Sequence, residues 1–408
     1  MENKPLWLQN EIQDYAWGSY TFIQSLLGET RNDTPWAELW MGAHPKAPSR
    51  VLTSGGWQRL DELIATCPEK ILGPATARRY NNCLPYLFKV LAAQQPLSLQ
   101  AHPDEEQARN GCAREDHEGI PLDAPHRNYK DDRRKPECLC ALTPFHALKG
   151  FRPISEMTEL FSEVCPKSLA DAMEFLRQSP HANGLKRFFE ALMTLPENKL
   201  QEVLEETTAN AMARQEEREE FRWIKALSEM YPEDAGILSP ILLNLICLQP
   251  GEALFLNSGE MHAYLEGCGI EIMANSDNVL RGGLTAKHVD VAELMRALDF
   301  TPRKSEILTP QAGAACESVY PTPVAEFSLS VIDVDDTCSY SRQQIEGPEI
   351  LLCIRGTVEI GWDDSPEAVS VERGGSLLVP ACLSSYRIAG NARLYRAAVG
   401  RTDPDDAD

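Results

Sequence analysis

Short runs of alternating apolar and polar residues fill the first 150 positions of the chain. Between Leu97 and His102 the apolar residues take every second position, and Ser98, Gln100 and His102 take the others. A period of two is typical of a β-strand, because successive side chains point to opposite faces. Gln100 and His102 should therefore project together, about 7 Å apart along the strand. We expect residues 1–152 to be mainly β-strands joined by turns.

The hydrophobic period changes between residues 153 and 240. Here Phe221, Ile224, Leu227 and Tyr231 recur at helical spacing, opposite a charged face. This spacing predicts an amphipathic helix packed on a core. Residues 153–240 are thus predicted to form a helical domain inserted between two strand-rich parts. Three other stretches of this domain have the same character, MTELFSEV, SLADAMEFLRQ and GLKRFFEALMTL.

Strand-like runs return after the helical domain and continue toward the end of the chain. Residues 288–298 are an exception, because they have a helical pattern with Asp290 as the expected N-cap and a glutamate three residues on. We assign 241–300 to the same β domain as 1–152, and 301–408 to a second β domain. The pattern therefore predicts a mainly β protein with a helical insertion.

The composition is ordinary for a globular protein, with 43% hydrophobic and 25% charged residues in a chain of 408. No apolar run approaches the ~18 residues of a membrane span, and the N-terminal segment lacks the basic start and apolar core of a secretory signal. The formal net charge of −22 argues against nucleic acid and anionic membranes as partners. We expect a cytoplasmic protein.

Twelve cysteines are scattered along the chain without paired C-x-x-C spacing. Four of them, Cys138, Cys140, Cys247 and Cys353, lie within apolar, strand-like runs. Small buried thiols in a reducing compartment explain this distribution better than disulfides do. We therefore predict free cysteines.

Four polar residues of the strand-rich parts are candidates for binding a metal ion. Gln100 and His102 share one strand face, and Glu137 stands two residues after Lys135 in YKDDRRKPECLCAL. His262 lies in the turn-and-strand segment GEALFLNSGEMHAYLEG. Two imidazoles, a carboxylate and an amide oxygen that converge inside a barrel would suit a divalent metal such as Zn²⁺. A single histidine is more often structural, so the hypothesis depends on these residues meeting.

The C-terminal part repeats the turn spacing but not the histidine. The interval between Gly251 and His262 recurs between Gly374 and Ser385, with serine in the place of histidine. A barrel-like domain that has lost the ligand position would not bind a metal there. We predict a second, metal-free β domain with a structural or interface role.

Eight short segments carry a resemblance to a known family. They are YAWGS at 15, AELWMGAHPKAPS at 37, LPYLFKVLA at 84, PLSLQAHPD at 96, YKDDRRKPE at 129, HAYLEG at 262, EIMANSDN at 271 and RGGLTAK at 281. In this order they resemble the motifs of the type I mannose-6-phosphate isomerases, which belong to the cupin superfamily. The resemblance extends from residue 12 to about residue 300.

The resemblance implies a fold, a reaction and a cofactor. The fold is a cupin or jelly-roll catalytic barrel with an α-helical domain and a second, metal-free jelly-roll-like domain at the C-terminus. The reaction interconverts mannose 6-phosphate and fructose 6-phosphate through a metal-stabilised cis-enediol(ate). The partner is then a small phosphosugar, bound by a monomer or a homodimer. By resemblance, Arg281 is the catalytic arginine and one Zn²⁺ per chain is bound by Gln100, His102, Glu137 and His262.

Such a reaction needs a base and a site for the phosphate. Lys135 is the first candidate for the base, because a metal ion and an arginine nearby would favour its neutral form. Asp277 competes with it for this role or for sugar-ring opening, although the segment around Asp277 is equally typical of a turn. Lys89 and Lys287 are the candidates for holding the phosphate. They would create a local positive site in an acidic chain.

Arg133 and Arg134 depart from the family motif, which has asparagine and histidine at these positions. The change removes a titratable imidazole and adds two permanent charges. It motivates a second hypothesis, a regulatory paralogue that binds metal and sugar phosphate but has lost turnover. A metal-dependent cupin oxygenase is a third hypothesis, and a lysine and an arginine beside the metal fit a phosphosugar better.

Overall fold

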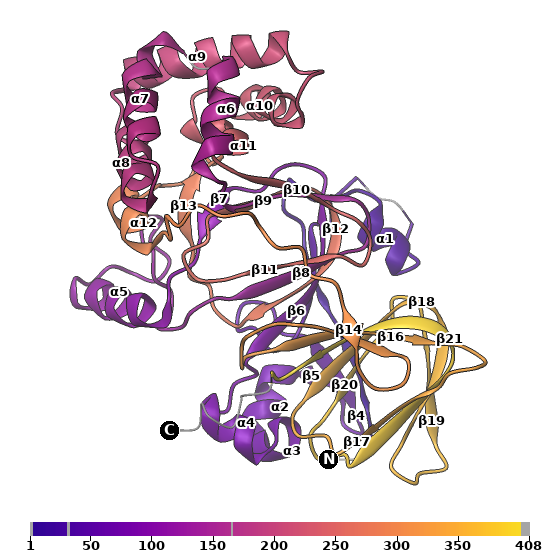
Figure 1. Cartoon of the computed structure of the whole chain (residues 1–408). Coiled ribbons are helices and arrows are strands. Elements are labelled where there is room, and N and C mark those ends of the chain that lie inside the picture. The colour runs from indigo at the N-terminus through magenta and orange to yellow at the C-terminus, as the bar shows by residue number, and fades with distance from the viewer. Residues whose placement is uncertain (1–2, 31–32, 165, 401–408) are drawn as a thin grey trace.

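The computed structural model describes residues 3–30, 33–164 and 166–400. Within these ranges the strands form two antiparallel sheets, one of ten strands and one of eleven. In Figure 1 the helical insertion lies at one end of the molecule, the ten-stranded sheet in the middle and the eleven-stranded sheet at the other end. This arrangement confirms the predicted mainly β fold with a helical insertion.

The ten-stranded sheet is organised around one long strand, β12 (His262–Ala274). It pairs with β6 (Tyr86–Ala93), β7 (Leu99–Ala101), β8 (Glu137–Ala141) and β9 (Phe145–Phe151). Both β6 and β8 are buried along their whole length, which explains why these segments are almost continuous apolar runs. The other strands of this sheet are β2 (Glu11–Gln13), β3 (Glu38–Met41), β10 (Leu243–Leu248), β11 (Ala253–Leu256) and β13 (Leu280–Gly283).

The helical insertion interrupts a pair of neighbouring strands. β9 and β10 pair along their length, from Phe145 opposite Leu248 to Phe151 opposite Leu243. The chain therefore leaves the sheet and re-enters it at the same edge.

The helices of the insertion are not membrane spans, because none of the described helices is both long and apolar enough to cross a bilayer. Between β9 and β10 lie α6 (Ile154–Val164), η1 (Lys167–Leu169), α7 (Ala170–Gln178), α8 (Ala182–Met193), α9 (Glu197–Ala213), α10 (Glu219–Met230), η2 (Ala235–Leu238) and α11 (Ser239–Leu242).

The hydrophobic pattern predicts α6, α7, α8 and α10 but does not single out α9. In α10 the expected stripe is buried as far as Leu227, whereas Tyr231 lies just beyond the helix and is half-buried. α9 has 17 residues, of which only Val203, Leu204, Thr207 and Ala211 are buried. A narrow stripe that contains a threonine gives a weak periodic signal.

The eleven-stranded sheet combines strands from both ends of the chain. β1 (Leu6–Gln9) pairs with β20 (Ser376–Val379) on one side and with β4 (Arg50–Thr53) on the other. β4 pairs in turn with β5 (Gly56–Arg59). The sequence-based boundaries place these three N-terminal strands in the first β domain. In the structure they belong to the same sheet as the C-terminal strands and are joined to it through the pairing of β1 with β20. The remaining strands are β14 (Gln311–Ala312), β15 (Glu317–Tyr320), β16 (Ser328–Val334), β17 (Tyr340–Gln343), β18 (Glu349–Trp362), β19 (Ala368–Glu372) and β21 (Ser385–Ala398).

Two helices outside the insertion have well-defined N-termini. The helix expected at 288–298 is shorter, α12 (Val291–Ala297), and the Asp290 side chain caps it by accepting a hydrogen bond from a backbone N–H. α5 (Glu105–His117), which the pattern does not predict, begins with a capping box between Asp104 and Gln107. The other helices are α1 (Phe22–Leu26), α2 (Leu60–Thr66), α3 (Pro68–Leu72) and α4 (Pro74–Arg79).

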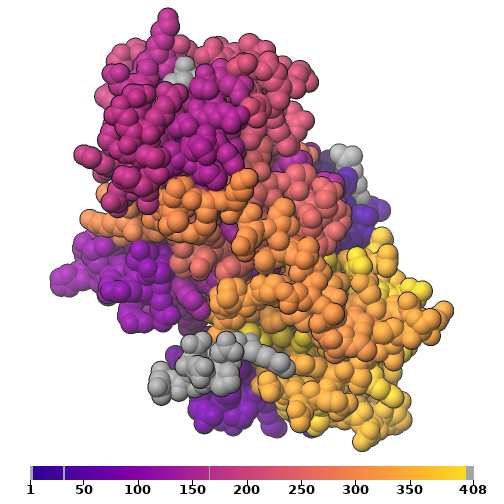
Figure 2. Space-filling model, in the orientation of Figure 1, coloured from indigo at the N-terminus to yellow at the C-terminus, as the bar shows by residue number. Residues whose placement is uncertain are grey.

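The segment after α12 crosses the ten-stranded sheet before it reaches the C-terminal strands. Ser305 Oγ donates a hydrogen bond to the Lys149 carbonyl, and Leu308 forms a bridge with Ala253 of β11. In Figure 2 this orange segment covers the front of the molecule between the helical insertion and the yellow C-terminal strands. It therefore ties the two sheets together.

The prediction that all cysteines are free is wrong in one place. Cys316 and Cys338 form a disulfide, because β16 returns the chain beside them and the Asp333 N–H donates to the Cys316 carbonyl. Cys247 is free but only half-buried, and Cys165 lies outside the described residues. The buried cysteines are free as predicted, and they are Cys138, Cys140, Cys268 and Cys353.

Candidate metal centre

His102, Glu137 and His262 come together in the interior of the ten-stranded sheet. One potential ligand atom of each lies within 4.8 Å of the other two. His102 Nε2 is 3.2 Å from Glu137 Oε1, and His262 Nε2 is 3.5 Å from Glu137 Oε2. All three residues are buried and expose 2% of their surface or less. Three of the four predicted metal ligands therefore meet.

Strand pairing brings these residues together. His262 opens β12 and lies opposite Gln100 of β7, and His102 follows β7 directly. Glu137 opens β8 and pairs with the end of β11. The turn from β11 to β12 passes through Gly259, whose φ is +77° and where an added Cβ would lie 2.8 Å from a backbone oxygen. The Gly259 N–H donates to the His102 carbonyl and so fixes this turn against the end of β7.

The second nitrogen of each imidazole determines its tautomer. His102 Nδ1 is 2.7 Å from the Asn278 carbonyl, and His262 Nδ1 is 2.8 Å from the Glu260 carbonyl. A carbonyl only accepts, so each Nδ1 carries the hydrogen and each Nε2 presents a lone pair. Across the described ranges neither Nε2 has a hydrogen-bond partner. Lone pairs that face a buried carboxylate are unfavourable unless a cation lies between them, so the residues present fit Zn²⁺.

The electrostatics of these side chains also suit a metal site. Burial, followed by the charge of Lys135, lowers the pKa of His102 to about 4, so its imidazole is neutral at pH 7. Burial alone would raise the pKa of Glu137, but Lys135 and His102 hold it well below its usual range. Neutral imidazoles and an ionised carboxylate are the forms that bind zinc.

Gln100 and Arg281 lie opposite each other on the neighbouring strands β7 and β13. Both residues are half-buried. Gln100 also lies opposite His262, so its backbone is adjacent to the cluster. Burial lowers the pKa of Arg281, and no carboxylate of the described residues offsets this effect. The Arg281 guanidinium is therefore available to an anionic ligand, and the roles predicted for Gln100 and Arg281 stay predictions.

Lys135 shares the carboxylate that the two histidines face. Its Nζ lies 3.0 Å from Glu137 Oε1, and the residue is 8% exposed. The two residues are two positions apart, and the predicted strand-like spacing does bring their side chains together. Lys135 thus lies directly beside the cluster, where a proton carrier for the expected reaction would be needed.

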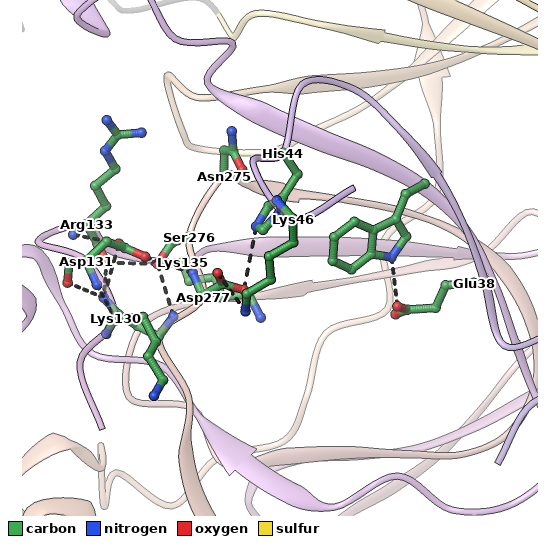
Figure 3. Close-up of polar contacts among 12 residues, drawn as sticks. Glu38, His44, Lys46, Lys130, Asp131, Arg133, Lys135, Asn275, Ser276 and Asp277 are labelled. Atoms are coloured by element: carbon green, nitrogen blue, oxygen red, sulfur yellow. Dashed lines mark hydrogen bonds and ion pairs between the residues drawn. The ribbon is translucent and has the colours of Figure 1, made fainter. Parts of the chain in front are cut away.

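Asp277 lies in a separate group of charged side chains, shown in Figure 3. His44 Nε2 is 3.5 Å from one carboxylate oxygen of Asp277, and Lys46 Nζ is 3.0 Å from the other. His44 is buried and packs edge-on against Trp40, with 4.9 Å between the ring centroids. Burial would raise the pKa of Asp277, but His44 and Lys46 hold it well below its usual range. Asp277 is therefore a stable anion and a weak base.

Asn278 and Ser276 hold two loops together. The Asn278 Oδ1 accepts a hydrogen bond of 2.7 Å from the Lys130 N–H, and its Nδ2 donates to the Asp131 and Arg133 carbonyls at 2.8 Å. Ser276 Oγ donates to Asp131 Oδ1 at 2.8 Å. These bonds fix the segment before Lys135 against the segment before Arg281. Asn278 is fully buried, so its role is structural, as the turn interpretation predicts.

Lys89 lies in a buried ion cluster that the sequence analysis did not foresee. Its Nζ is 2.9 Å from Glu271 Oε2 and 3.4 Å from Glu38 Oε1, and it lies over the Trp40 ring. Burial opposes the charge, but Glu271 and Glu38 raise the pKa of Lys89 well above its usual range. The sequence did contain a signal for this buried cluster, because each of its three residues is a charged residue within a largely apolar strand. Lys287, the other predicted phosphate ligand, is exposed on the loop after β13.

Arg134 points toward the C-terminal sheet. Its Nε and Nη2 donate to the two carboxylate oxygens of Glu326, at 2.7 and 2.8 Å. This two-pronged contact links the loop before Glu137 to the segment between β15 and β16. The arginine in the family's histidine position thus makes a contact between the two sheets.

Two family models match the chain. The model for the phosphomannose isomerase type I catalytic domain matches residues 6–154, and the model for the helical insertion domain matches residues 160–243. A mannose-6-phosphate isomerase from Shigella flexneri is 41% identical over 392 residues, covering 95% of this chain and 98% of that protein. One from Rattus norvegicus is 34% identical over 420 residues, covering 95% and 96%.

Solved structures are similar over almost the same length. A zinc-bound mannose 6-phosphate isomerase has a TM-score of 0.88 and 37% identity, and the match covers 97% of this chain and all of that one. A variant of the phosphomannose isomerase from Salmonella typhimurium has a TM-score of 0.90 and 38% identity, with the same coverage. Because motifs, family models and full-length relatives agree, the chain belongs to the type I phosphomannose isomerase family.

Proposed function

We propose that this chain interconverts mannose 6-phosphate and fructose 6-phosphate, with one Zn²⁺ held by Gln100, His102, Glu137 and His262. The observation that carries the proposal is the buried trio of two imidazoles and a carboxylate, in which both Nδ1 atoms are already committed to carbonyls. When bound, Zn²⁺ would supply Lewis-acid stabilisation of negative charge on the sugar oxygens. Relatives that carry this activity in their name span nearly the whole chain.

The reaction moves a proton between carbon 2 and carbon 1 of the open-chain sugar through a cis-enediol(ate). That proton is weakly acidic, so the charge that develops on the oxygens must be stabilised in place. Arg281 is suited to this task, because its half-buried guanidinium has no carboxylate to neutralise it within the described ranges. A positioned base typically contributes about 10²–10⁴ in rate.

We assign the base to Lys135 rather than to Asp277. Lys135 lies against the cluster, 3.0 Å from Glu137, whereas Asp277 already binds His44 and Lys46. A carboxylate that is stabilised as an anion by two such partners is a weak base, because taking up a proton would weaken both interactions. The contribution that fits Asp277 is to accept a hydrogen bond from a sugar hydroxyl, or to assist ring opening.

The phosphate group requires a cation that is free to bind it. Lys89 is bound by two buried carboxylates, and this pairing favours a structural role beneath the metal site. Lys287 is exposed on the loop after β13, the strand that carries Arg281, so we propose Lys287 as the phosphate ligand. Replacing Lys287 by methionine should then raise KM for mannose 6-phosphate by about tenfold.

The activity is tested by following fructose 6-phosphate formation from mannose 6-phosphate before and after chelation. Turnover should vanish with the chelator and return when zinc is restored. A folded, zinc-loaded protein without turnover would overturn the proposal and favour the regulatory paralogue instead. One observation favours the regulatory paralogue: Arg134 pairs with Glu326, so the position at which the family has a histidine carries no imidazole. Arg134→His would then be the variant to build.

The proposal also covers partners and location. A net charge of −22 disfavours nucleic acids and anionic membranes as partners, so we propose a small phosphosugar as the only partner molecule. We propose the cytoplasm as the location. We propose a monomer or a homodimer. Sedimentation velocity at several protein concentrations would distinguish the two.

A further inference from the structure

A cavity of about 400 Å³ lies outside the metal cluster, between α4, α5 and the segment before β16. Its charged lining consists of four arginines and three acidic residues, and none of the predicted metal ligands contributes to it. The chain as a whole carries a net charge of −22. A cavity in which positive charges outnumber negative ones is therefore a local exception that favours an anion.

Two of the four arginines have no carboxylate partner among the described residues. Arg79 packs over the ring of Tyr80, with 5.6 Å between its guanidinium carbon and the ring centroid. The Arg133 side chain makes no hydrogen bond or ion pair in the same part of the chain, and neither does the exposed Asp132. The other charged groups are neutralised in the pairs Arg134–Glu326 and Arg109–Glu105.

Tyr80 contributes a polar atom that is not satisfied. Its hydroxyl oxygen is buried and has no hydrogen-bond partner among the described residues. Burial raises the pKa of Tyr80 to about 12, so the hydroxyl keeps its proton and can donate at neutral pH. Two guanidinium groups and one hydroxyl donor form the type of donor set that binds phosphate oxygens, which only accept.

We propose that this cavity is a second anion site, which binds a small molecule with a phosphate group through Arg79, Arg133 and Tyr80. The volume suits a phosphate monoester or a free phosphate ion. Arg133 is one of the two residues that depart from the family motif, so the site is a property of this chain. It goes beyond the isomerase reaction, because it lies apart from the metal ligands.

The site also has a route to the catalytic residues. The Arg133 carbonyl accepts hydrogen bonds from Asn278 Nδ2 at 2.8 Å and from Ser276 Oγ at 3.3 Å. Asn278 in turn accepts from His102 Nδ1 through its own carbonyl. An anion that binds the Arg133 side chain would therefore shift the position of the loop that precedes Lys135. Phosphate bound here should change kcat, whereas phosphate that only competes with substrate would change KM alone.

Equilibrium dialysis tests the proposal directly. The zinc-loaded protein is dialysed against labelled inorganic phosphate in the presence of saturating mannose 6-phosphate, and the wild-type protein should retain one equivalent. Arg133→Gln and Arg79→Gln should each weaken this binding by about tenfold or more, and Tyr80→Phe by about fivefold. The matched control is Arg222→Gln, an exposed arginine of α10 that pairs with Glu219, which should bind as the wild type does.

Two results would overturn the proposal. Displacement of the phosphate by mannose 6-phosphate with the same concentration dependence as turnover would make the cavity part of the substrate site. Unchanged affinity in both Arg133→Gln and Arg79→Gln would place the bound phosphate elsewhere. The same dialysis with labelled glycerol 3-phosphate distinguishes the two candidate ligands, a phosphate monoester and a free phosphate ion. Tighter binding than that of phosphate identifies a phosphorylated metabolite as the ligand, and weaker binding identifies free phosphate.

Discussion

Each of the two sheets buries a cluster of charged side chains, but only one of these clusters is closed. In the eleven-stranded sheet, Arg396 donates hydrogen bonds to both Glu317 and Glu349. Tyr340 and Tyr386 donate to the same two carboxylates. Every charge of this cluster therefore faces an opposite charge or a donor, and the protein itself supplies all of the partners.

The cluster of His102, Glu137 and His262 in the ten-stranded sheet has more hydrogen-bond acceptors than donors. His102 and His262 present their Nε2 lone pairs to Glu137, and neither nitrogen has a hydrogen-bond partner among the described residues. Lys135 supplies one donor to the carboxylate, which does not satisfy the nitrogens. A closed cluster stabilises a fold, whereas an open one needs a cation from outside to be complete. This contrast distinguishes a structural charge cluster from a binding site.

The largest effect should come from removing the carboxylate of the open cluster. Glu137→Ala deletes the residue that both imidazoles face, so zinc retention and stabilisation of the developing charge are lost together. Turnover should fall by about 10³ or more. Coupled-assay turnover and zinc content by mass spectrometry check this, with Glu359→Gln on an exposed part of β18 as the control. Normal turnover in Glu137→Ala would contradict the site assignment.

Breaking the closed cluster should affect stability instead. Arg396→Met leaves Glu317 and Glu349 buried without their main cation, which typically costs about 3–5 kcal/mol of unfolding free energy. Urea unfolding measures the loss, and zinc content of the folded protein should stay at the wild-type level. The triple variant that adds Glu317→Gln and Glu349→Gln should recover part of the stability. A loss below about 1 kcal/mol would show that the cluster is not closed in solution.

The two clusters should respond to acid in different pH windows. The folded pKa of His102 is about 4, below the unfolded value of about 6.5, so the unfolded chain binds more protons between these values. The metal-free protein should therefore lose up to about 3 kcal/mol as pH falls through this window. Glu317 is buried, which would raise its pKa, but Arg396 lowers it, so its contribution is lost only below about pH 4.

Chemical unfolding of the chelated protein at a series of pH values tests this order. His102→Gln should remove the loss between pH 6.5 and 4, because the variant has no imidazole to protonate at that position. Glu317→Gln should leave this window unchanged. A pH profile in which His102→Gln behaves as the wild type would show that the imidazole titrates normally in the folded protein.

The smallest effect is expected at the contact between the two sheets. Arg134→His replaces a two-pronged ion pair that is one-third exposed, so the unfolding free energy should fall by about 0.5–1 kcal/mol. Glu326→Gln should have a similar effect, and the double variant should cost little more than either single one. Urea unfolding of the four proteins measures this coupling, and additive losses would show that the pair contributes nothing.

The cluster of His102, Glu137 and His262 could be predicted from the sequence because each candidate ligand lies in a recognisable local pattern. Gln100 and His102 share a strand face by alternation, and Lys135 and Glu137 have the same spacing. The cluster of Lys89, Glu271 and Glu38 was not accessible in this way. Its members meet only through the register of β3, β6 and β12, and register depends on pairings that no single segment encodes.

The fold shows the same division between local and long-range information. Helical periodicity predicts most of the insertion, and the N-cap of α12 lies at the predicted Asp290. The pairing of β1 with β20 and the disulfide between Cys316 and Cys338 depend on contacts between distant or oppositely running segments. Such contacts leave no periodic signal in either partner, so hydrophobic patterns alone do not show that β1 pairs with β20.

The pairing of β1 with β20 also sets an order of events during synthesis. Leu6 lies opposite Leu378, so at ~5–20 residues per second the ribosome makes the partner strand roughly 20–70 seconds after β1. During that interval β1 and the β4–β5 hairpin have an unpaired edge, which can associate with other nascent chains. The eleven-stranded sheet is therefore completed late. A chain that stops before β20 would leave one edge of its first strand unpaired, although the other edge still pairs with β4.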